Sequence, residues 1–171
     1  MKNSLFLLLS FVAFVSLSSC RISKKKKQKY IAGLYQEMKD SFPNTELILF
    51  EDSIKMIFPD DIIFEIGSAQ IKTTFFERLT KLSTVINKYE KVNILINGHT
   101  DNTGEEQVNK QLSKLRAESA KQILVKSRVY PKRIFVWGFG ARMPRDSNDT
   151  EQGKARNRRV EFVLLYPKER I

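Results

Sequence analysis

The chain has 171 residues, 42% of them hydrophobic, which supports one globular domain with a sizeable core and argues against several domains. Its formal net charge of +11 at pH 7 is unusual for such a domain. An excess of basic residues can bind nucleic acid or an anionic membrane surface. The position of these residues along the chain therefore decides which of the two partners is excluded.

Residues 1–19 have the pattern of a secretory signal peptide, in which Lys2 precedes an apolar run from Leu5 to Leu17 and then small residues. The run is shorter than the roughly 20 residues of a membrane span. Residues 17–20, LSSC, resemble the lipobox of bacterial lipoproteins, which implies cleavage before Cys20 and a lipid on that cysteine. An uncleaved anchor and a plain signal peptide are the alternatives. Because Cys20 is the only cysteine, no intramolecular disulfide is expected.

A basic block follows from Arg21 to Lys29, with six positive charges and no acidic residue. Without the signal peptide the chain has 29 basic and 19 acidic residues, and without the block as well it has 23 and 19. We expect the block to be a solvated, disordered tether over residues 20–30, which could reach about 35 Å. This placement argues against nucleic-acid binding by the folded domain and favours an anionic lipid or cell-wall surface.

The first elements of the domain precede residue 72. A short helix is predicted at residues 30–42, ended by Pro43. Alternating apolar residues at 45–59 predict a hairpin that turns at Glu51 and Asp52. A third strand is predicted at residues 60–71, running into Gly67 and Ser68.

Two amphipathic helices are predicted at residues 70–89 and 105–127. Thr103 and Glu106 fit a capping box at the start of the second helix. Strands are predicted at 92–98, 133–140 and 158–167, with a polar loop at 141–156. The expected core residues are Ile71, Phe75, Leu79, Leu82, Val85 or Ile86, and Tyr89 in the first helix and Val108, Leu112, Leu115 and Ile123 in the second.

The segment Asn97–Gly104, NGHTDNTG, joins a strand to a helix. Its residues suit a turn, and Asp101 precedes a helix N-terminus, where negative charge is stabilised, so the segment is consistent with a plain turn. Arg116 lies about three turns into the helix, on the same face as Asn109. A fixed carboxylate and a fixed guanidinium would suit a zwitterionic ligand. The alternative is a solvated Arg116 that pairs with a nearby acid such as Glu118 or with a residue of the loop.

We expect no enzyme activity, because no catalytic motif accompanies His99, the only histidine. One histidine and one cysteine cannot form the usual protein-only zinc site. We therefore expect neither a metal nor a cofactor.

Residues 93–124 and 133–164 closely resemble the C-terminal peptidoglycan-binding domain of the outer-membrane protein A family, shared with the peptidoglycan-associated lipoprotein and flagellar stator protein B. The signatures are GHTDNTG, NKQLSKLRAESAK, GFGARMP and NRRVEF. Residues 62–71, IIFEIGSAQI, resemble the opening strand of the family. The resemblance covers about residues 60–165. It implies a βαβαβ two-layer α+β sandwich, with two main helices on a mixed sheet, at residues 60–171; residues 31–59 would add a helix and a hairpin.

The resemblance also implies non-covalent binding of the diaminopimelate side chain of the peptidoglycan stem peptide, by Asp101 through its ammonium and by Arg116 through its carboxylate. We interpret His99 as packed or hydrogen-bonded rather than ligand-binding, and Arg158 and Arg159 as partly structural. Further residues implied at or beside the site are Thr100, Asn109, Phe64, Gly67, Ser68, Leu112, Ser113 and Arg158.

The sequence thus predicts a lipoprotein that tethers the outer membrane to the cell wall, with its domain in the periplasm. Arg21 follows Cys20 where an aspartate would favour the inner membrane in many lipoproteins. One alternative is a stator-like inner-membrane protein with an uncleaved anchor. Another is a scaffold or anchoring subunit of a larger secretion or motility machine, with mainly protein contacts.

Overall fold

A computed structural model describes residues 24–65 and 67–167, which contain a five-stranded sheet with the strand order β1-β2-β5-β3-β4. In the sheet β3 and β4 run parallel, and the other neighbours are antiparallel. The predicted α+β class and mixed sheet are therefore confirmed. The strands are β1 (Glu46–Leu49), β2 (Ser53–Pro59), β3 (Asn93–His99), β4 (Ile134–Gly140) and β5 (Arg159–Leu165).

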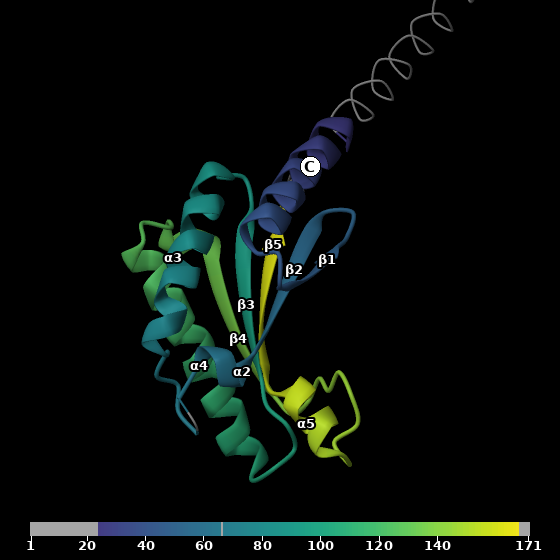
Figure 1. Ribbon diagram of the computed structural model, residues 1–171, viewed down its shortest axis with the longest axis vertical. Coiled ribbons are helices and arrows are strands. Elements are labelled where there is room, and N and C mark those ends of the chain that lie inside the picture. The colour runs from purple at the N-terminus through teal and green to yellow at the C-terminus, as the bar shows by residue number, and fades with distance from the viewer. Residues whose placement is uncertain (1–23, 66, 168–171) are drawn as a thin grey trace, which may run out of the picture.

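Two long helices, α3 (Thr73–Lys88) and α4 (Glu106–Lys126), lie on one side of the sheet, and the short α5 (Glu151–Asn157) lies on the other (Figure 1). A further helix, residues 24–41, packs at one end of the molecule and is called the N-terminal helix below. The elements α2 (Asp60–Ile63) and the 3₁₀ helix η1 (Pro131–Arg133) are single turns. Within the described residues, no helix combines the length and the apolar character that a membrane crossing requires.

The core lies between the sheet and its helices and is built from aligned rows of side chains. One row joins Ile54, Leu164 and Ile94 across β2, β5 and β3. The helix α3 packs on these rows and meets the prediction for its apolar face, with Tyr89 only partly buried at its end. Its fully buried leucines and isoleucine are each worth about 1.5–3 kcal/mol relative to exposure. The buried residues of α3 are Phe75, Leu79, Leu82, Ser83, Val85 and Ile86.

The predicted core face of α4 is wrong. Val108 is 57% exposed and Leu115 is 45% exposed, whereas Ile123 is buried as expected. The reason is a close approach to the strands, since a Cβ added to Gly98 would lie 2.0 Å from the carbonyl oxygen of Ser113. Large side chains do not fit there, so this helix is buried through small and polar residues. They are Asn109, Ser113, Arg116, Ala117 and Ala120, followed by Ile123 and Leu124.

The strand predicted at residues 60–71 is also wrong. Residues Asp60–Ile63 form α2, and only Phe64 and Ile71 make an isolated bridge. The change begins at Pro59, because proline has no N–H for a ladder and is the N-cap of α2. The predicted hairpin is confirmed, since β1 and β2 pair antiparallel and extend the sheet at its β5 edge. Its second strand, β2, pairs with β5 along its full length, so the sheet includes residues on both sides of position 60.

The basic block is not the disordered segment that we expected, because residues 24–29 are already helical. Lysine is a good helix former, and contacts with the body hold this end of the helix. Lys24 pairs with Glu51 at 2.7 Å, and Lys27 lies 3.7 Å from Asp52. The Tyr30 ring then packs edge-on against two other tyrosine rings of the body. Cys20 and residues 1–19 lie outside the described residues.

Two smaller local predictions fail for physical reasons. Thr103 does not cap α4, whose N-cap is Glu105 without a side-chain hydrogen bond. The predicted polar loop at 141–156 contains most of α5, which begins after Thr150 because the Thr150 hydroxyl accepts a hydrogen bond from the N–H of Gly153 at 3.0 Å. This cap satisfies one of the free N–H groups of the helix start.

Candidate functional site

The junction between β3 and α4 is a fixed turn. The Asp101 carboxylate accepts a hydrogen bond from the N–H of Thr103 at 2.9 Å, and Asn109 Nδ2 donates to the carbonyl oxygen of Thr103 at 2.9 Å. Gly104 adopts a positive φ of 84°, which favours glycine. The turn therefore holds Asp101, which is buried, in one position. Its two possible roles, a plain turn and a site, are compatible.

Arg116 is not solvated, because it is only 4% exposed. Its Nη1 lies 2.8 Å from Asp60 Oδ2, and its Nε donates to the carbonyl oxygen of Ser68 at 3.0 Å. Its guanidinium also lies 5.1 Å from the centre of the Phe64 ring, within cation–π distance. The alternative of a solvated Arg116 paired with Glu118 is wrong, since Arg116 is buried and pairs with Asp60.

Asp101 and Arg116 are linked through two further charged side chains. Arg158 Nη1 donates to Asp101 Oδ2 at 2.6 Å, and Arg158 Nε lies 3.7 Å from Asp60 Oδ1. Asp60 then contacts Arg116, so negative and positive groups alternate along the chain Asp101–Arg158–Asp60–Arg116. Burial raises the pKa of the Asp101 carboxyl, but the hydrogen bonds from Arg158 and Thr103 outweigh this effect and lower the pKa overall. The site therefore holds Asp101 as a carboxylate at neutral pH.

These charged groups line one cavity of about 520 Å³, which we call the Asp101–Arg116 cavity. Of the ten predicted ligand-site residues, all but Ser68 and Ser113 line it. Ser68 contributes its carbonyl to Arg116, and Ser113 Oγ accepts from the N–H of Gly140 at 2.9 Å, so both support the walls. The lining residues are Asp60, Asp61, Phe64, Glu65, Gly67, Lys72, Thr100, Asp101, Asn109, Leu112, Arg116 and Arg158.

Sequence reasoning missed four of these lining residues, Asp60, Asp61, Glu65 and Lys72. Asp60 matters most because it contacts both arginines. Asp60 was overlooked because residues 60–71 were predicted to be a strand. The alternation of side chains along a strand gives no reason to place Asp60 beside Arg116 of α4. The adjacent acids after Pro59 were the available signal, because aspartates after a proline are typical of a first helical turn.

The Thr100 hydroxyl is an unusual feature of the cavity. Thr100 is 5% exposed, and its Oγ1 has no hydrogen-bond partner among the described residues. A buried hydroxyl without a partner costs about 1–3 kcal/mol, so native proteins generally supply one. Thr100 lines the cavity, but its hydroxyl oxygen is itself buried, so a ligand would reach it only through a movement of the cavity wall.

His99 is packed rather than part of the cavity. It is 3% exposed and stacks on Phe139 with ring centres 5.3 Å apart, and within the described part of the chain neither ring nitrogen has a hydrogen-bond partner. Burial, followed by the charge of Arg159, lowers its pKa to about 4. The interpretation of His99 as packed is confirmed. Arg159 is structural, as expected, because its Nε donates to Glu161 at 2.9 Å in a buried pair.

Within residues 24–65 and 67–167, no group of three or more histidine, cysteine, aspartate or glutamate side chains could hold a metal ion. The cavity offers carboxylates, guanidiniums, a hydroxyl and the Phe64 ring. This set can bind a small ligand that carries both charges, through charge-assisted hydrogen bonds.

Comparisons with known proteins support the fold and show the family. The chain is 37% identical to the probable lipoprotein YiaD of Escherichia coli over 113 residues, 66% of this chain and 52% of that one, so it spans about half the length of that relative. A solved structure of a putative MotB-like protein from Desulfovibrio vulgaris superposes with a TM-score of 0.75 at 24% identity, over 85% of this chain and 97% of that one. The cell wall anchor of the Pseudomonas aeruginosa T6SS superposes with a TM-score of 0.68 at 23% identity, over 80% and 97% of the two chains. The model of the OmpA family matches residues 63–158, more than half of the chain, and the protein therefore belongs to the OmpA family.

Proposed function

We propose that this protein is an outer-membrane lipoprotein that binds peptidoglycan non-covalently through the diaminopimelate of the stem peptide, and so tethers the membrane to the cell wall. One observation carries the proposal: the Asp101 carboxylate and the Arg116 guanidinium, both on buried residues, line a single cavity. The proposed role is binding without catalysis. Family membership supports it, as does the likeness to a probable lipoprotein and to a cell wall anchor.

The side chain of diaminopimelate ends in a carbon that carries both an ammonium and a carboxylate. Asp101 would accept the ammonium, and Arg116 would bind the carboxylate. Arg116 contacts Ser68 through Nε and Asp60 through Nη1, so the ligand carboxylate would bind its remaining N–H groups. One such contact should bind with micromolar to millimolar affinity, roughly −4 to −8 kcal/mol. Many copies facing one polymer would gain avidity.

The first test is co-sedimentation of the full chain in detergent with purified diaminopimelate-type peptidoglycan. Asp101→Asn and Arg116→Gln should each weaken binding by about tenfold or more, because each leaves half of the zwitterion unpaired. Arg142→Gln is the matched control, since Arg142 pairs with Glu106 on the surface, outside the cavity. If all variants sediment like the wild type, the cavity is not the wall site.

A second arm tests diaminopimelate itself. Lysine-type peptidoglycan has the ammonium but lacks the adjacent carboxylate, so Arg116 would have no partner on it. The wild type should bind lysine-type peptidoglycan about tenfold more weakly, and Arg116→Lys should recover only part of the binding to the diaminopimelate type, because lysine lacks the guanidinium fork. Equal binding to both polymers would exclude recognition of that carboxylate.

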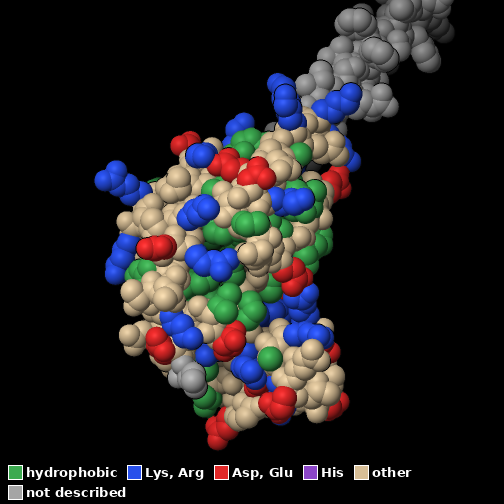
Figure 2. Space-filling model, in the orientation of Figure 1, with side chains coloured by type: hydrophobic (Ala, Val, Ile, Leu, Met, Phe, Trp, Pro, Cys, Tyr) green, Lys and Arg blue, Asp and Glu red, His purple; other side chains and the backbone are tan. Residues whose placement is uncertain are grey.

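The anchor would act close to the domain. If a lipid is attached to Cys20, at most about 14 Å of chain separates it from the helix at residue 24. Within the helix the rise is about 1.5 Å per residue, so the earlier expectation of a 35 Å flexible reach does not apply. Basic side chains gather where the described part of this helix begins (Figure 2). They would rest on anionic headgroups and hold the domain at the membrane, in a salt-dependent manner.

The mass of the membrane-extracted protein tests the anchor. Loss of residues 1–19 with an added lipid mass on Cys20 is expected, and Cys20→Ser should release the protein from the outer-membrane fraction. An intact N-terminus on the extracted protein would exclude the lipoprotein.

An anchoring role in a larger envelope machine is the second candidate, and one surface favours it. On β4, Phe135 is 47% exposed and Trp137 is 58% exposed. Both lie on the face of the sheet opposite the main core, and exposed aromatic side chains are enriched in protein interfaces. A photo-reactive residue at position 137 should then crosslink to a defined envelope protein, without loss of wall sedimentation. Absence of crosslinks in intact cells would exclude this surface as the contact.

A further inference from the structure

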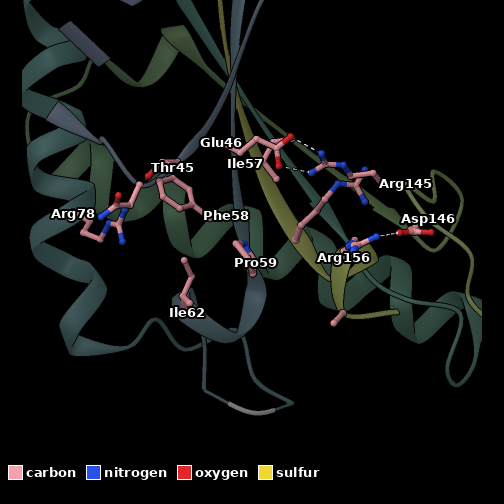
Figure 3. A pocket seen from close by; sticks show the side chains of 13 residues that line it. Thr45, Glu46, Ile57, Phe58, Pro59, Ile62, Arg78, Arg145, Asp146 and Arg156 are labelled. Carbon is pink, nitrogen blue, oxygen red and sulfur yellow. Dashed lines mark hydrogen bonds and ion pairs between the residues drawn. The ribbon is translucent and has the colours of Figure 1, made fainter. Parts of the chain in front are cut away.

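A second cavity lies apart from the Asp101–Arg116 cavity and is not used by the proposed function. It has a volume of about 480 Å³, within the range typical of ligand sites. The short helix α2 separates the two cavities, because Asp60 and Asp61 line the first and Ile62 lines the second. Figure 3 shows Arg78 at one end of this cavity, Arg145 and Arg156 at the other, and Phe58 and Pro59 between them. We call it the Arg78 cavity.

Arg78 differs from the other arginines of this cavity in its partners. Arg145 forms two hydrogen bonds with Glu46, Arg156 pairs with Asp146 at 2.5 Å, and Arg159 pairs with Glu161. Arg78 has no carboxylate within 4.0 Å among the described residues. Its guanidinium donates a hydrogen bond from Nη2 to Thr45 Oγ1, at 2.9 Å.

The aromatic rings beside Arg78 hold its guanidinium in place. The guanidinium carbon lies 5.3 Å from the centre of the Phe58 ring and 5.7 Å from that of Phe75, and the residue is half-buried. These rings restrict the side chain without neutralising its charge. A fixed guanidinium with free N–H groups binds a carboxylate through two parallel hydrogen bonds. A single unpaired guanidinium fits one carboxylate better than it fits a doubly charged phosphate.

The other lining residues of the cavity indicate which groups the ligand carries besides the carboxylate. Its middle is lined by Ile57, Phe58, Pro59 and Ile62, and Ile62 is 39% exposed there. The far end holds neutralised pairs, which offer both hydrogen-bond donors and acceptors. Peptide amide groups match such pairs, and an apolar side chain larger than the methyl of alanine fits the middle.

Strand pairing also favours an extended chain. The strand β1 begins at Glu46, which is opposite Ile57, while β2 continues through Phe58 and Pro59. These two residues have partners on β5 but none on β1. Pro59 has no N–H group, so a peptide in the cavity would lie beside this uncovered end of β2 rather than continue the strand ladder through it.

We propose that the Arg78 cavity binds an extended peptide segment of a protein partner, with a carboxylate on Arg78 and a large apolar side chain against Phe58, Pro59 and Ile62. The segment does not compete with a ligand in the Asp101–Arg116 cavity. The protein can therefore hold a wall polymer and a protein partner together.

The test uses two probes that differ only in the carboxylate, N-acetyl-phenylalanine and N-acetyl-phenylalaninamide. The full ¹⁵N-labelled chain in detergent is titrated by NMR up to about 10 mM, which detects the millimolar affinity expected of so small a ligand. N-acetyl-phenylalanine should shift Thr45, Ile62 and the Arg78 Nε–H, and the amide should bind about tenfold more weakly. Equal binding of the two probes, shifts only in the Asp101–Arg116 cavity, or no shifts would each overturn the proposal.

Variants separate the guanidinium from the rest of the cavity. Arg78→Gln should abolish the difference between the probes, and Arg78→Lys should keep part of it. Arg156→Gln is the matched control, because Arg156 is in the same cavity but already paired, and it should bind within about twofold of the wild type. Unchanged resonances elsewhere establish that each variant is folded.

A sedimentation arm identifies the source of the peptide. Arg78→Gln should sediment with peptidoglycan like the wild type, because the proposed occupant belongs to a protein. Loss of wall binding in Arg78→Gln would show that this cavity binds a stem peptide, and it would overturn the assignment to a protein partner. Failure of the wall-binding proposal itself would appear in Asp101→Asn and Arg116→Gln, which leave the Arg78 cavity intact.

Discussion

The helices α3 and α4 cover the same face of the same sheet but are held there by different contacts. The buried face of α3 is apolar except for Ser83, and its members are large. The buried face of α4 includes Asn109, Ser113 and Arg116, and it approaches the strands at Gly98. A helix that presents fixed polar groups to a cavity gives up large apolar contacts at those positions. It regains contact by lying closer to the sheet, which requires glycine on the strand beneath.

This comparison predicts that damage to α3 acts on stability and damage to α4 acts on binding. In α3 most buried positions contribute apolar area. In α4 the polar positions hold the Asp101–Arg116 cavity together, and two of its large apolar residues, Val108 and Leu115, are exposed. Each prediction below changes one side of the comparison.

The largest effect is expected from Leu79→Ala in α3. Leu79 is 1% exposed, so its truncation should lower the free energy of unfolding by about 2–5 kcal/mol, through lost burial and the cavity left behind. Leu115→Ala in α4 is the matched control, because this leucine is 45% exposed and its loss should cost about 0.5 kcal/mol or less. Urea unfolding measures the free energy of unfolding of the two variants. Similar losses in Leu79→Ala and Leu115→Ala would mean that large apolar side chains contribute equally to stability in α3 and α4.

The next largest effect is expected from Gly98→Ala, which should lower the free energy of unfolding by about 3 kcal/mol, at the upper end of the range for overpacking. The added Cβ would meet the backbone of Ser113 at 2.0 Å and 2.7 Å, and a backbone cannot turn aside as a side chain can. Gly67→Ala controls for glycine itself. Gly67 has a φ of 64° but nothing within 4 Å of an added Cβ, so it should lose only about 1–2 kcal/mol, from backbone strain.

His99, the last residue of β3, should also make the stability of the fold depend on pH. The unfolded chain has His99 near its ordinary pKa of 6.5, whereas the folded pKa is about 4, so the unfolded state binds more protons between these values. Stability should therefore fall on acidification, by about 2 kcal/mol between pH 6.5 and pH 5. The lowered pKa values of Asp101 and Glu161 act only at lower pH. Urea unfolding across this range should show the slope in the wild type and not in His99→Gln.

A slope that persists in His99→Gln would place the titrating group elsewhere. Lys55, Arg159 and Glu161 are the charged groups that influence His99. The pKa of Glu161 is lowered from its ordinary value, so this carboxyl does not supply an alternative slope in that window.

The same contrast explains what the sequence could predict. The apolar period of α3 identified its buried face, because large side chains at helical spacing have one place to go. The period of α4 misled, since its packing depends on glycines of β3 and β4 that only the fold brings beneath it. For the site, the turn chemistry and the odd position of Arg116 located two charges. Asp60 was missed for two reasons. Its contact with Arg116 joins residues 56 positions apart, and the helix α2, to which Asp60 belongs, was predicted to be a strand.

No loss of stability is expected from Thr100→Val, which therefore isolates binding from folding. The Thr100 hydroxyl has no partner among the described residues, so its replacement by a methyl of similar size removes an unsatisfied buried group and should not lower the free energy of unfolding. If a ligand in the Asp101–Arg116 cavity uses this hydroxyl, sedimentation with peptidoglycan should weaken about threefold to tenfold, the worth of one hydrogen bond. Thr100→Ser should retain binding, because it keeps the hydroxyl. A lower free energy of unfolding together with unchanged binding in Thr100→Val would show that the hydroxyl stabilises the fold and takes no part in ligand binding.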